Sequence, residues 1–183
     1  ILAEEPSLFP DTLLDDVPPE PSDRLWWALY TKARQEKAVS RQMLALEIPF
    51  YLPLLKKQLF RRARRCLEYV PLFPGYVFLY GSEAERLRAL ATNRIVQAIR
   101  APDPDRLHLE LQQLRRLIAS GAPLTVESRL AAGDRVRVRS GPLMGIEGSV
   151  LKRRDTTRLL VAVNFLQQGA SVQIDDFLLE PIG

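Results

Sequence analysis

Short strands separated by glycines near the end of the chain restrict its fold more than any other feature of the sequence. Residues 134–139 alternate strictly, with Val136 and Val138 on one side and arginines on the other. This period is typical of a β-strand with one buried face. Gly141, Gly145 and Gly148 punctuate the next turn, and further β-branched runs follow. The pattern predicts a small antiparallel β-barrel over residues 133–183.

Longer elements fill residues 24–101. Strand-like runs at residues 25–30, 48–55, 69–80 and 95–99 alternate with helical periodicity at residues 36–46 and 83–92. This order predicts an α/β sandwich in which helices pack on a sheet. A linker of residues 102–132 follows, with a helix at residues 107–118. The predicted fold class is therefore α+β, an N-terminal sandwich followed by a C-terminal barrel.

Charge is distributed unevenly between these segments. Residues 1–23 contain seven acids, five prolines and no lysine or arginine. We expect a disordered acidic tail there, either solvated or folded back on a basic domain. Residues 24–101 carry 15 bases against five acids, whereas the last fifty residues are nearly balanced. A basic first domain and a neutral second one suggest different partners.

Residue types that support catalysis or metal binding are scarce. The single cysteine, Cys66, and the single histidine, His108, make neither an intramolecular disulfide nor a zinc site. We interpret Cys66 as a small residue in a hairpin arm and His108 as a surface or boundary residue. The sequence contains no Gly-rich phosphate loop, serine elbow or metal-ligand cluster. We therefore expect a protein that is not an enzyme and binds no cofactor or metal.

The sequence also favours an intracellular location. No apolar run approaches the roughly 20 residues of a membrane helix. The acidic first segment differs from a secretory leader, which is basic and then apolar. We expect a cytoplasmic protein with no membrane contact.

The run from Pro71 to Leu79 combines two prolines, a glycine and alternating aromatic residues. Prolines preset the backbone, and Gly75 permits a sharp entry into a strand. Alternation then places Tyr76 and Phe78 on one sheet face, where Trp26 and Tyr30 would complete an aromatic patch. Left exposed, such a patch marks a protein contact. Plain core packing is the alternative.

Two motifs resemble the NusG family. The first motif resembles the opening of the NusG N-terminal domain. It is Trp-Trp-Ala-Leu-Tyr-Thr-Lys-Ala-Arg at residues 26–34, followed by Glu36 and Lys37. Residues 71–78 resemble its central strand, in a Leu-Phe-Pro form closer to RfaH-like antiterminators. The resemblance covers residues 25–183. It implies that this sheet face grips the clamp helices of the largest RNA polymerase subunit through Trp26, Tyr30, Phe73, Pro74, Gly75, Tyr76 and Phe78.

A basic arm lies between two predicted strands. Six of the ten residues 56–65 are basic, namely Lys56, Lys57, Arg61, Arg62, Arg64 and Arg65. Arginine-rich arms bind phosphates without reading sequence. The family resemblance places this hairpin near upstream or non-template DNA. A solvated hairpin that only aids solubility is the alternative.

Residues 133–138 and 141–150 resemble the KOW motif, a strand, a glycine-bearing turn and a second strand. In the NusG family this barrel binds the termination factor Rho or a small-subunit ribosomal protein. The candidate partner-binding residues are Gly141, Leu143, Gly145, Ile146, Gly148 and Phe165. In the alternative interpretation the apolar members of this set close the barrel core.

These features together predict a monomeric regulator of transcription elongation. It would favour one polymerase conformation by binding to it, and so promote processivity and antitermination. In this prediction the protein is associated with the nucleoid through the polymerase, and the KOW domain recruits a partner. The alternatives are a ribosome- or RNA-binding KOW protein acting in translation, and a termination factor that recruits Rho.

Overall fold

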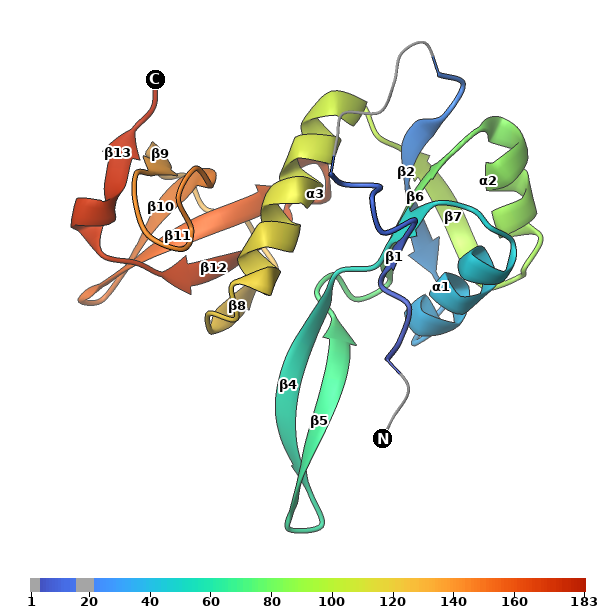
Figure 1. Cartoon of the computed structure of the whole chain (residues 1–183), viewed down its shortest axis with the longest axis horizontal. Coiled ribbons are helices and arrows are strands. Elements are labelled where there is room, and N and C mark those ends of the chain that lie inside the picture. Colours follow the sequence, from blue (N-terminus) through green and yellow to red (C-terminus); the bar gives the residue numbers. More distant parts are fainter. Residues whose placement is uncertain (1–3, 16–21) are drawn as a thin grey trace. The chain divides into compact units, whose positions relative to one another are not determined.

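The computed structural model describes residues 4–15 and 22–183. The chain divides into two compact units, Ile1–Pro104 and Asp105–Gly183, each with its own β-sheet (Figure 1). Among the described residues, no helix is both long enough and apolar enough to cross a membrane. The predicted α+β fold class is confirmed, because strands dominate both units and three α-helices accompany them.

The first unit is built on a five-stranded antiparallel sheet with the order β1-β3-β6-β2-β7. Helices α1 and α2 lie on one face of this sheet (Figure 1), and the residues between them and the strands are buried. The elements are β1 (Leu8–Phe9), β2 (Leu25–Thr31), α1 (Glu36–Ala45), β3 (Phe50–Tyr51), β6 (Tyr76–Gly81), α2 (Glu83–Leu90) and β7 (Ile95–Arg100).

Local sequence accounts for both helices. Helix α1 buries Val39 and Met43, four residues apart on one face, against the sheet. Helix α2 begins with a capping box: the Ser82 hydroxyl accepts from the Glu85 amide, and the Glu85 carboxylate accepts from the Ser82 amide. This box satisfies two amides that the first turn would otherwise leave unpaired.

The N-terminal segment differs from its prediction. The expectation of a disordered acidic tail over residues 1–23 is wrong for residues 4–15; residues 1–3 and 16–21 lie outside the described residues. Leu8 and Phe9 pair with Tyr51 and Phe50 of β3. Ser7 adds two hydrogen bonds to the backbone of Leu52, of 2.7 and 2.8 Å.

The reason is the edge of the sheet. Strand β3 would otherwise expose unpaired backbone groups, which this segment satisfies. Phe9 packs against the apolar core, and Glu5 forms a 2.6 Å ion pair with Arg41 of α1. Four apolar residues among the acids (Leu8, Phe9, Leu13 and Leu14) therefore outweigh the polar composition of the segment.

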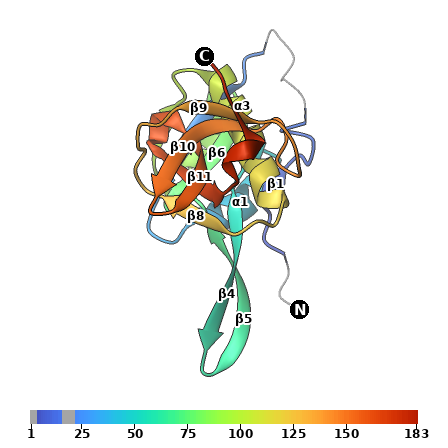
Figure 2. The same ribbon diagram turned by 90° about the vertical axis from the view of Figure 1, so that its left-hand side faces the viewer.

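The predicted strand at residues 69–80 is two strands separated by a turn. Strand β5 (Arg64–Pro71) pairs with β4 (Leu54–Arg61) in a separate two-stranded sheet, here called the arm. The arm extends away from the sheet of the first unit in both views (Figures 1 and 2). Pro49 and Pro53 bracket β3, so the predicted strand at residues 48–55 is divided between β3 and the first two residues of β4.

The second unit contains a six-stranded antiparallel sheet with the order β13-β9-β10-β11-β12-β8, whose strands are labelled in Figure 1. Val136 and Val138 are buried, as their alternation predicts. The unit comprises nearly all of α3 (Pro104–Ala119), then β8 (Leu124–Glu127), β9 (Arg135–Val138), β10 (Glu147–Arg153), β11 (Thr156–Val163), β12 (Gln168–Gln173) and β13 (Leu179–Pro181), with 3-10 turns at Asn164–Leu166 and Asp176–Leu178.

Residues 102–132, expected to form a linker, contribute a helix and a strand to this second unit. Strand β8 pairs with β12 over four residues and completes the sheet. His108, expected at the surface or boundary, is 2% exposed within α3. The helical spacing of the leucines predicts that this segment is a helix, but it does not predict which of its other side chains are buried.

The paired N-terminal segment makes a testable contribution to stability. We expect Phe9→Ala to lower the free energy of unfolding by about 1–3 kcal/mol, because the ring packs on the core of the first unit. Phe177→Ala, at a phenylalanine that is 66% exposed, should change it by less than about 0.5 kcal/mol. Urea unfolding of both variants checks this, and equal stabilities would show that the segment does not hold the sheet edge.

Candidate functional site

The sheet face opposite α1 and α2 is aromatic. Trp26, Ala28 and Tyr30 of β2 lie directly across from Tyr80, Phe78 and Tyr76 of β6. The Trp26 and Tyr80 ring centroids are 5.2 Å apart, and those of Tyr30 and Tyr76 are 5.3 Å apart. Alternation thus places the predicted aromatic residues on one face, with Val77 and Leu79 on the helix side.

Burial divides this aromatic face into two parts. Trp26, Phe73 and Phe78 are at most 1% exposed, and the Phe73 and Phe78 rings meet edge to face at 5.8 Å. Tyr30, by contrast, is 42% exposed, and its neighbour Tyr76 is half-buried. Among the predicted aromatic residues, Tyr30 and Tyr76 offer ring surface, whereas Trp26, Phe73 and Phe78 are buried. The two remaining predicted contact residues lie in the turn, where Pro74 is exposed and Gly75 is half-buried.

A tight turn fixes the accessible tyrosines. The Tyr76 amide donates to the Phe73 carbonyl at 3.0 Å, with Pro74 and Gly75 between them. Gly75 has a φ of +87°, which together with Pro74 identifies a type II turn. A Cβ atom at Gly75 would lie 3.1 Å from Cε2 of Tyr30, so the glycine also makes room for the ring.

Glu36 connects this turn to helix α1. Its carboxylate accepts a 2.7 Å hydrogen bond from the Gly75 amide, while the Gly75 carbonyl accepts one of 2.8 Å from the Thr31 amide. Glu36 is only 8% exposed and stands in the first turn of α1, where the helix dipole favours a negative charge. Sequence reasoning placed Glu36 in a family motif and did not identify this positioning role.

The arm presents two chemically different faces. Paired residues of an antiparallel ribbon point to the same side, and the register divides the arm accordingly. One side, here called the Phe60 face, carries Lys56, Gln58, Phe60, Arg65, Leu67 and Tyr69. The opposite side carries Lys57, Leu59, Arg61, Arg64, Cys66 and Glu68.

The predicted basic residues of the arm are all exposed. Glu68 is the single acid in the two strands and pairs with Arg61 at 3.3 Å. Arg62 and Ala63 form the two-residue turn at the tip, with φ values of 49° and 62°. Such turns favour asparagine and glycine, so the tip keeps an arginine where its backbone is strained.

The predicted KOW loop has glycines where the backbone requires them. Gly141 and Gly145 both have a φ of +87°, and a Cβ atom at Gly148 would lie 2.2 Å from the Leu160 carbonyl oxygen. Ile146 is fully buried, so it packs in the core, whereas Leu143 and Phe165 are half-buried. Met144 and Phe177, which sequence reasoning did not select, are 59% and 66% exposed.

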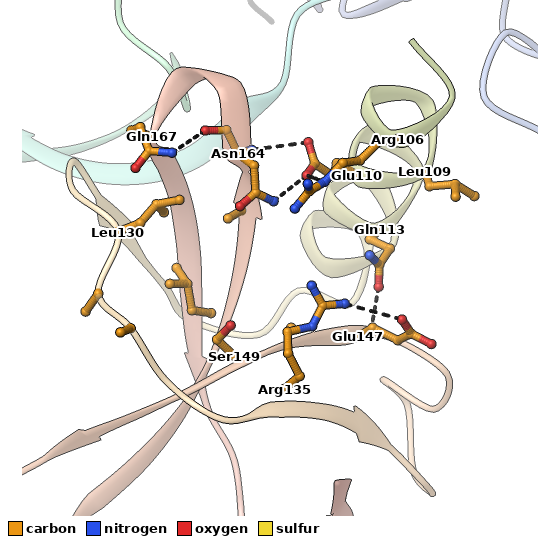
Figure 3. Close-up of a pocket in the computed structure, with 15 residues that line it drawn as sticks. Arg106, Leu109, Glu110, Gln113, Leu130, Arg135, Glu147, Ser149, Asn164 and Gln167 are labelled. Carbon is orange, nitrogen blue, oxygen red and sulfur yellow. Dashed lines mark hydrogen bonds and ion pairs between the residues drawn. The ribbon is translucent and has the colours of Figure 1, made fainter. Parts of the chain in front are cut away.

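Side chains three residues apart tie helix α3 to this loop and to the 3-10 turn at Asn164–Leu166. Glu110 accepts from the Asn164 amide and side chain at 3.2 and 2.5 Å, and Gln113 accepts from the Glu147 amide at 2.5 Å (Figure 3). Arg116 donates to the Met144 carbonyl at 2.5 Å.

A cavity of about 430 Å³ lies between these groups. Figure 3 shows Glu110 and Gln113 directed from the helix toward the strands. The side chains that could act on a ligand there are engaged with each other: Arg135 and Glu147 form a 3.7 Å ion pair, and Arg106 donates to Glu110 at 3.1 Å. Hydrogen bonding to Glu147 also raises the pKa of Arg137 above its ordinary value. These polar groups attach α3 to the sheet.

Among residues 4–15 and 22–183, no three His, Cys, Asp or Glu side chains cluster in a way that could hold a metal ion. Cys66 is a free, exposed thiol on the arm.

Glu36 gives a direct test of how the turn is positioned. We expect Glu36→Ala to lower the free energy of unfolding by about 1–3 kcal/mol, because it leaves the Gly75 amide without its acceptor. Glu36→Gln keeps an acceptor oxygen and should recover most of that loss. Thermal or urea unfolding measures both, and indistinguishable variants would mean that the hydrogen bond does not hold the turn.

Comparisons with known proteins identify the family of the first unit. A family model described as "Transcription termination factor nusG" matches residues 24–117, which is more than half of the chain. No curated protein matches. A solved structure described as "Crystal Structure of MjSpt4:Spt5 complex conformation B" is 14% identical, over 87% of this chain and 97% of that chain. Its TM-score of 0.29 is too low to support an argument. The match of the family model shows that the chain belongs to the NusG family of transcription elongation factors.

Proposed function

We propose that this protein binds RNA polymerase through Tyr30, Pro74, Gly75 and Tyr76 and acts as a specialised, RfaH-like antitermination factor. The observation that carries the proposal is the accessible tyrosine pair, fixed by a turn and a buried carboxylate within the segment that matches the family model. Tyrosines held rigidly at a surface are frequent anchors of protein interfaces, since they bury large area at little entropic cost.

The proposed partner surface is the clamp helices of the largest polymerase subunit. Binding there would favour the closed clamp and suppress pausing, because a ligand stabilises the conformation that it binds more tightly. The action is binding alone and uses no catalytic group. Trp26 packs against Tyr80 and Phe73 against Phe78, so these buried rings would help to fix the strands that carry the tyrosines.

The second unit is proposed to recruit a partner, Rho or a small-subunit ribosomal protein. Leu143 is half-buried in the loop whose turns Gly141 and Gly145 make possible, and Phe165 is half-buried in the 3-10 turn at Asn164–Leu166. Exposed Met144 extends the apolar surface of the same loop.

The arm is proposed to contact nucleic acid beside the polymerase, as upstream or non-template DNA. Its two strands and turn carry six lysine and arginine residues and one acidic residue, and all six basic side chains are exposed. Phosphate contacts of this kind orient a protein without reading sequence.

The polymerase contact can be tested in a pull-down with purified core RNA polymerase. Tyr30→Ala combined with Tyr76→Ala should weaken binding at least about 30-fold, as expected when interface anchors worth about 2 kcal/mol are removed. Leu44→Ala on α1, at a side chain as exposed as Tyr30, should bind like the wild type. Phe78→Ala is unsuitable because that ring is fully buried. Stoichiometric binding by the double variant would overturn this docking surface.

The arm contact can be tested separately, with the free protein and labelled DNA. Reversing Arg61, Arg62, Arg64 and Arg65 to Glu should lower affinity and flatten its dependence on salt, because fewer counterions are released. A matched control reverses four exposed arginines of the second unit, Arg129, Arg135, Arg139 and Arg154. If the two sets of reversals lowered DNA affinity equally, the effect would come from the net charge of the protein and not from a contact made by the arm.

A further inference from the structure

The arm is a sheet of only two strands, so each strand has an outer edge. Its register runs without a shift from the base to the closing pair, Arg61 and Arg64. In a hairpin with a two-residue turn the closing pair is hydrogen-bonded, and such pairs alternate with pairs whose backbone groups point outward. On β5 the outward amides and carbonyls are therefore those of Arg65, Leu67 and Tyr69.

No neighbouring element satisfies this edge of β5. Among residues 4–15 and 22–183, none outside the arm is hydrogen-bonded to the backbone of Arg65, Leu67 or Tyr69. The side chain of Leu67 is 51% exposed, so solvent reaches the centre of the edge. Open edges of this kind pair readily with another extended chain. The fold already contains one such addition, because the N-terminal segment, which combines acids with apolar residues, adds β1 to the edge of β3.

A groove of about 660 Å³ lies beside this edge. Its lining includes the five consecutive β5 residues 65–69, together with Glu5 of the N-terminal segment and Lys37 of α1. Consecutive residues of a strand point to opposite faces of a sheet. A groove that all five residues line therefore follows the edge of the strand and not one of its faces.

Charge indicates which kind of strand fits this groove. Four lysine and arginine side chains and two carboxylates line it. Both carboxylates, those of Glu5 and Glu68, are already paired with arginines. In the part of the chain that the structure describes, the lining residues Lys37, Lys56 and Arg65 form no ion pair. Pairing of two arms edge to edge would bring like charges together, whereas an acidic strand would neutralise them.

We propose that the edge of β5 binds an extended acidic segment of a partner protein, which adds a third strand to the arm. The backbone of this segment pairs with the outward groups of Leu67 and Tyr69. Its carboxylates lie against the cations of the groove, and its apolar side chains, at every second position, pack on Leu67. This contact goes beyond the proposed polymerase and nucleic-acid contacts and depends on neither.

The test measures binding of a fluorescein-labelled peptide of alternating Glu and Val to the full chain, by fluorescence anisotropy. Leu67→Pro removes the outward amide at the centre of the edge, and the hairpin does not use this amide in its own ladder. We expect at least about tenfold weaker binding, because a backbone hydrogen bond to the peptide is lost and the proline ring obstructs its neighbours.

Gln58→Pro is the matched control. Gln58 lies directly opposite Leu67 in the register, so its amide points outward from the other edge of the arm. Any distortion that proline causes in the ribbon is therefore present in both variants, and Gln58→Pro should bind the peptide like the wild type. Equal losses in the two variants, or no saturable binding by the wild type, would overturn the proposal.

Changes in the peptide distinguish strand addition from attraction between charges. N-methylation of two consecutive central residues removes one donor from each edge of the peptide and leaves its charge unchanged, so it should weaken binding at least about tenfold. A peptide of alternating Lys and Val should not bind. Equal binding of the methylated peptide would contradict strand addition. If Leu67→Pro weakened binding of an oligo-dT 20-mer but not of the acidic peptide, this edge would be a nucleic-acid contact and the proposal would be wrong.

Discussion

A single hydrogen bond, from the Gly75 amide to the Glu36 carboxylate, links the main parts of the first unit. It joins the start of α1 to the turn that begins β6, and so connects the helical layer with the sheet. A carboxylate this buried is tolerated only when it is hydrogen-bonded. The same turn determines where Tyr76 enters the sheet and how closely the Tyr30 ring can approach. The accessible tyrosine pair is therefore a consequence of the way α1 is anchored.

The aromatic face shows how packing and recognition can share one strand pair. Trp26, Phe78 and Phe73 give the sheet a rigid, buried foundation, and Tyr30 and Tyr76 stand at the end of the same rows. Side chains held by packed neighbours lose little entropy on binding. The arm differs because its two strands have few packed neighbours. It presents the exposed ring of Phe60 and six lysine and arginine side chains.

Periodicity predicted the parts of the fold in which one residue pattern decides the outcome. Helix α1 and the Val136–Val138 strand each bury residues that their repeats indicate. The sequence did not predict strand β1, because a strand of two residues is too short to show an alternating pattern. Its partner is the edge of β3, about 40 residues along the chain, and nothing in the N-terminal segment itself indicates that edge. Alternation placed Trp26 and Tyr30 on one face but could not tell which would be covered, since coverage depends on residues far along the chain. The same limit hid the role of Glu36, whose partner lies 39 residues away.

The two-residue turn at Arg62 and Ala63 determines which side chains lie together on each face of the arm. The arm packs little beyond its base, so the tip turn sets its register almost alone. Shifting the pairing by one residue would invert every side chain of one strand relative to the other. Arg65 would no longer face Phe60, and Glu68 would move to the Phe60 face. The chemical character of the arm is thus encoded in backbone geometry at its apex, where two left-handed residues keep Phe60 and Glu68 on opposite sides.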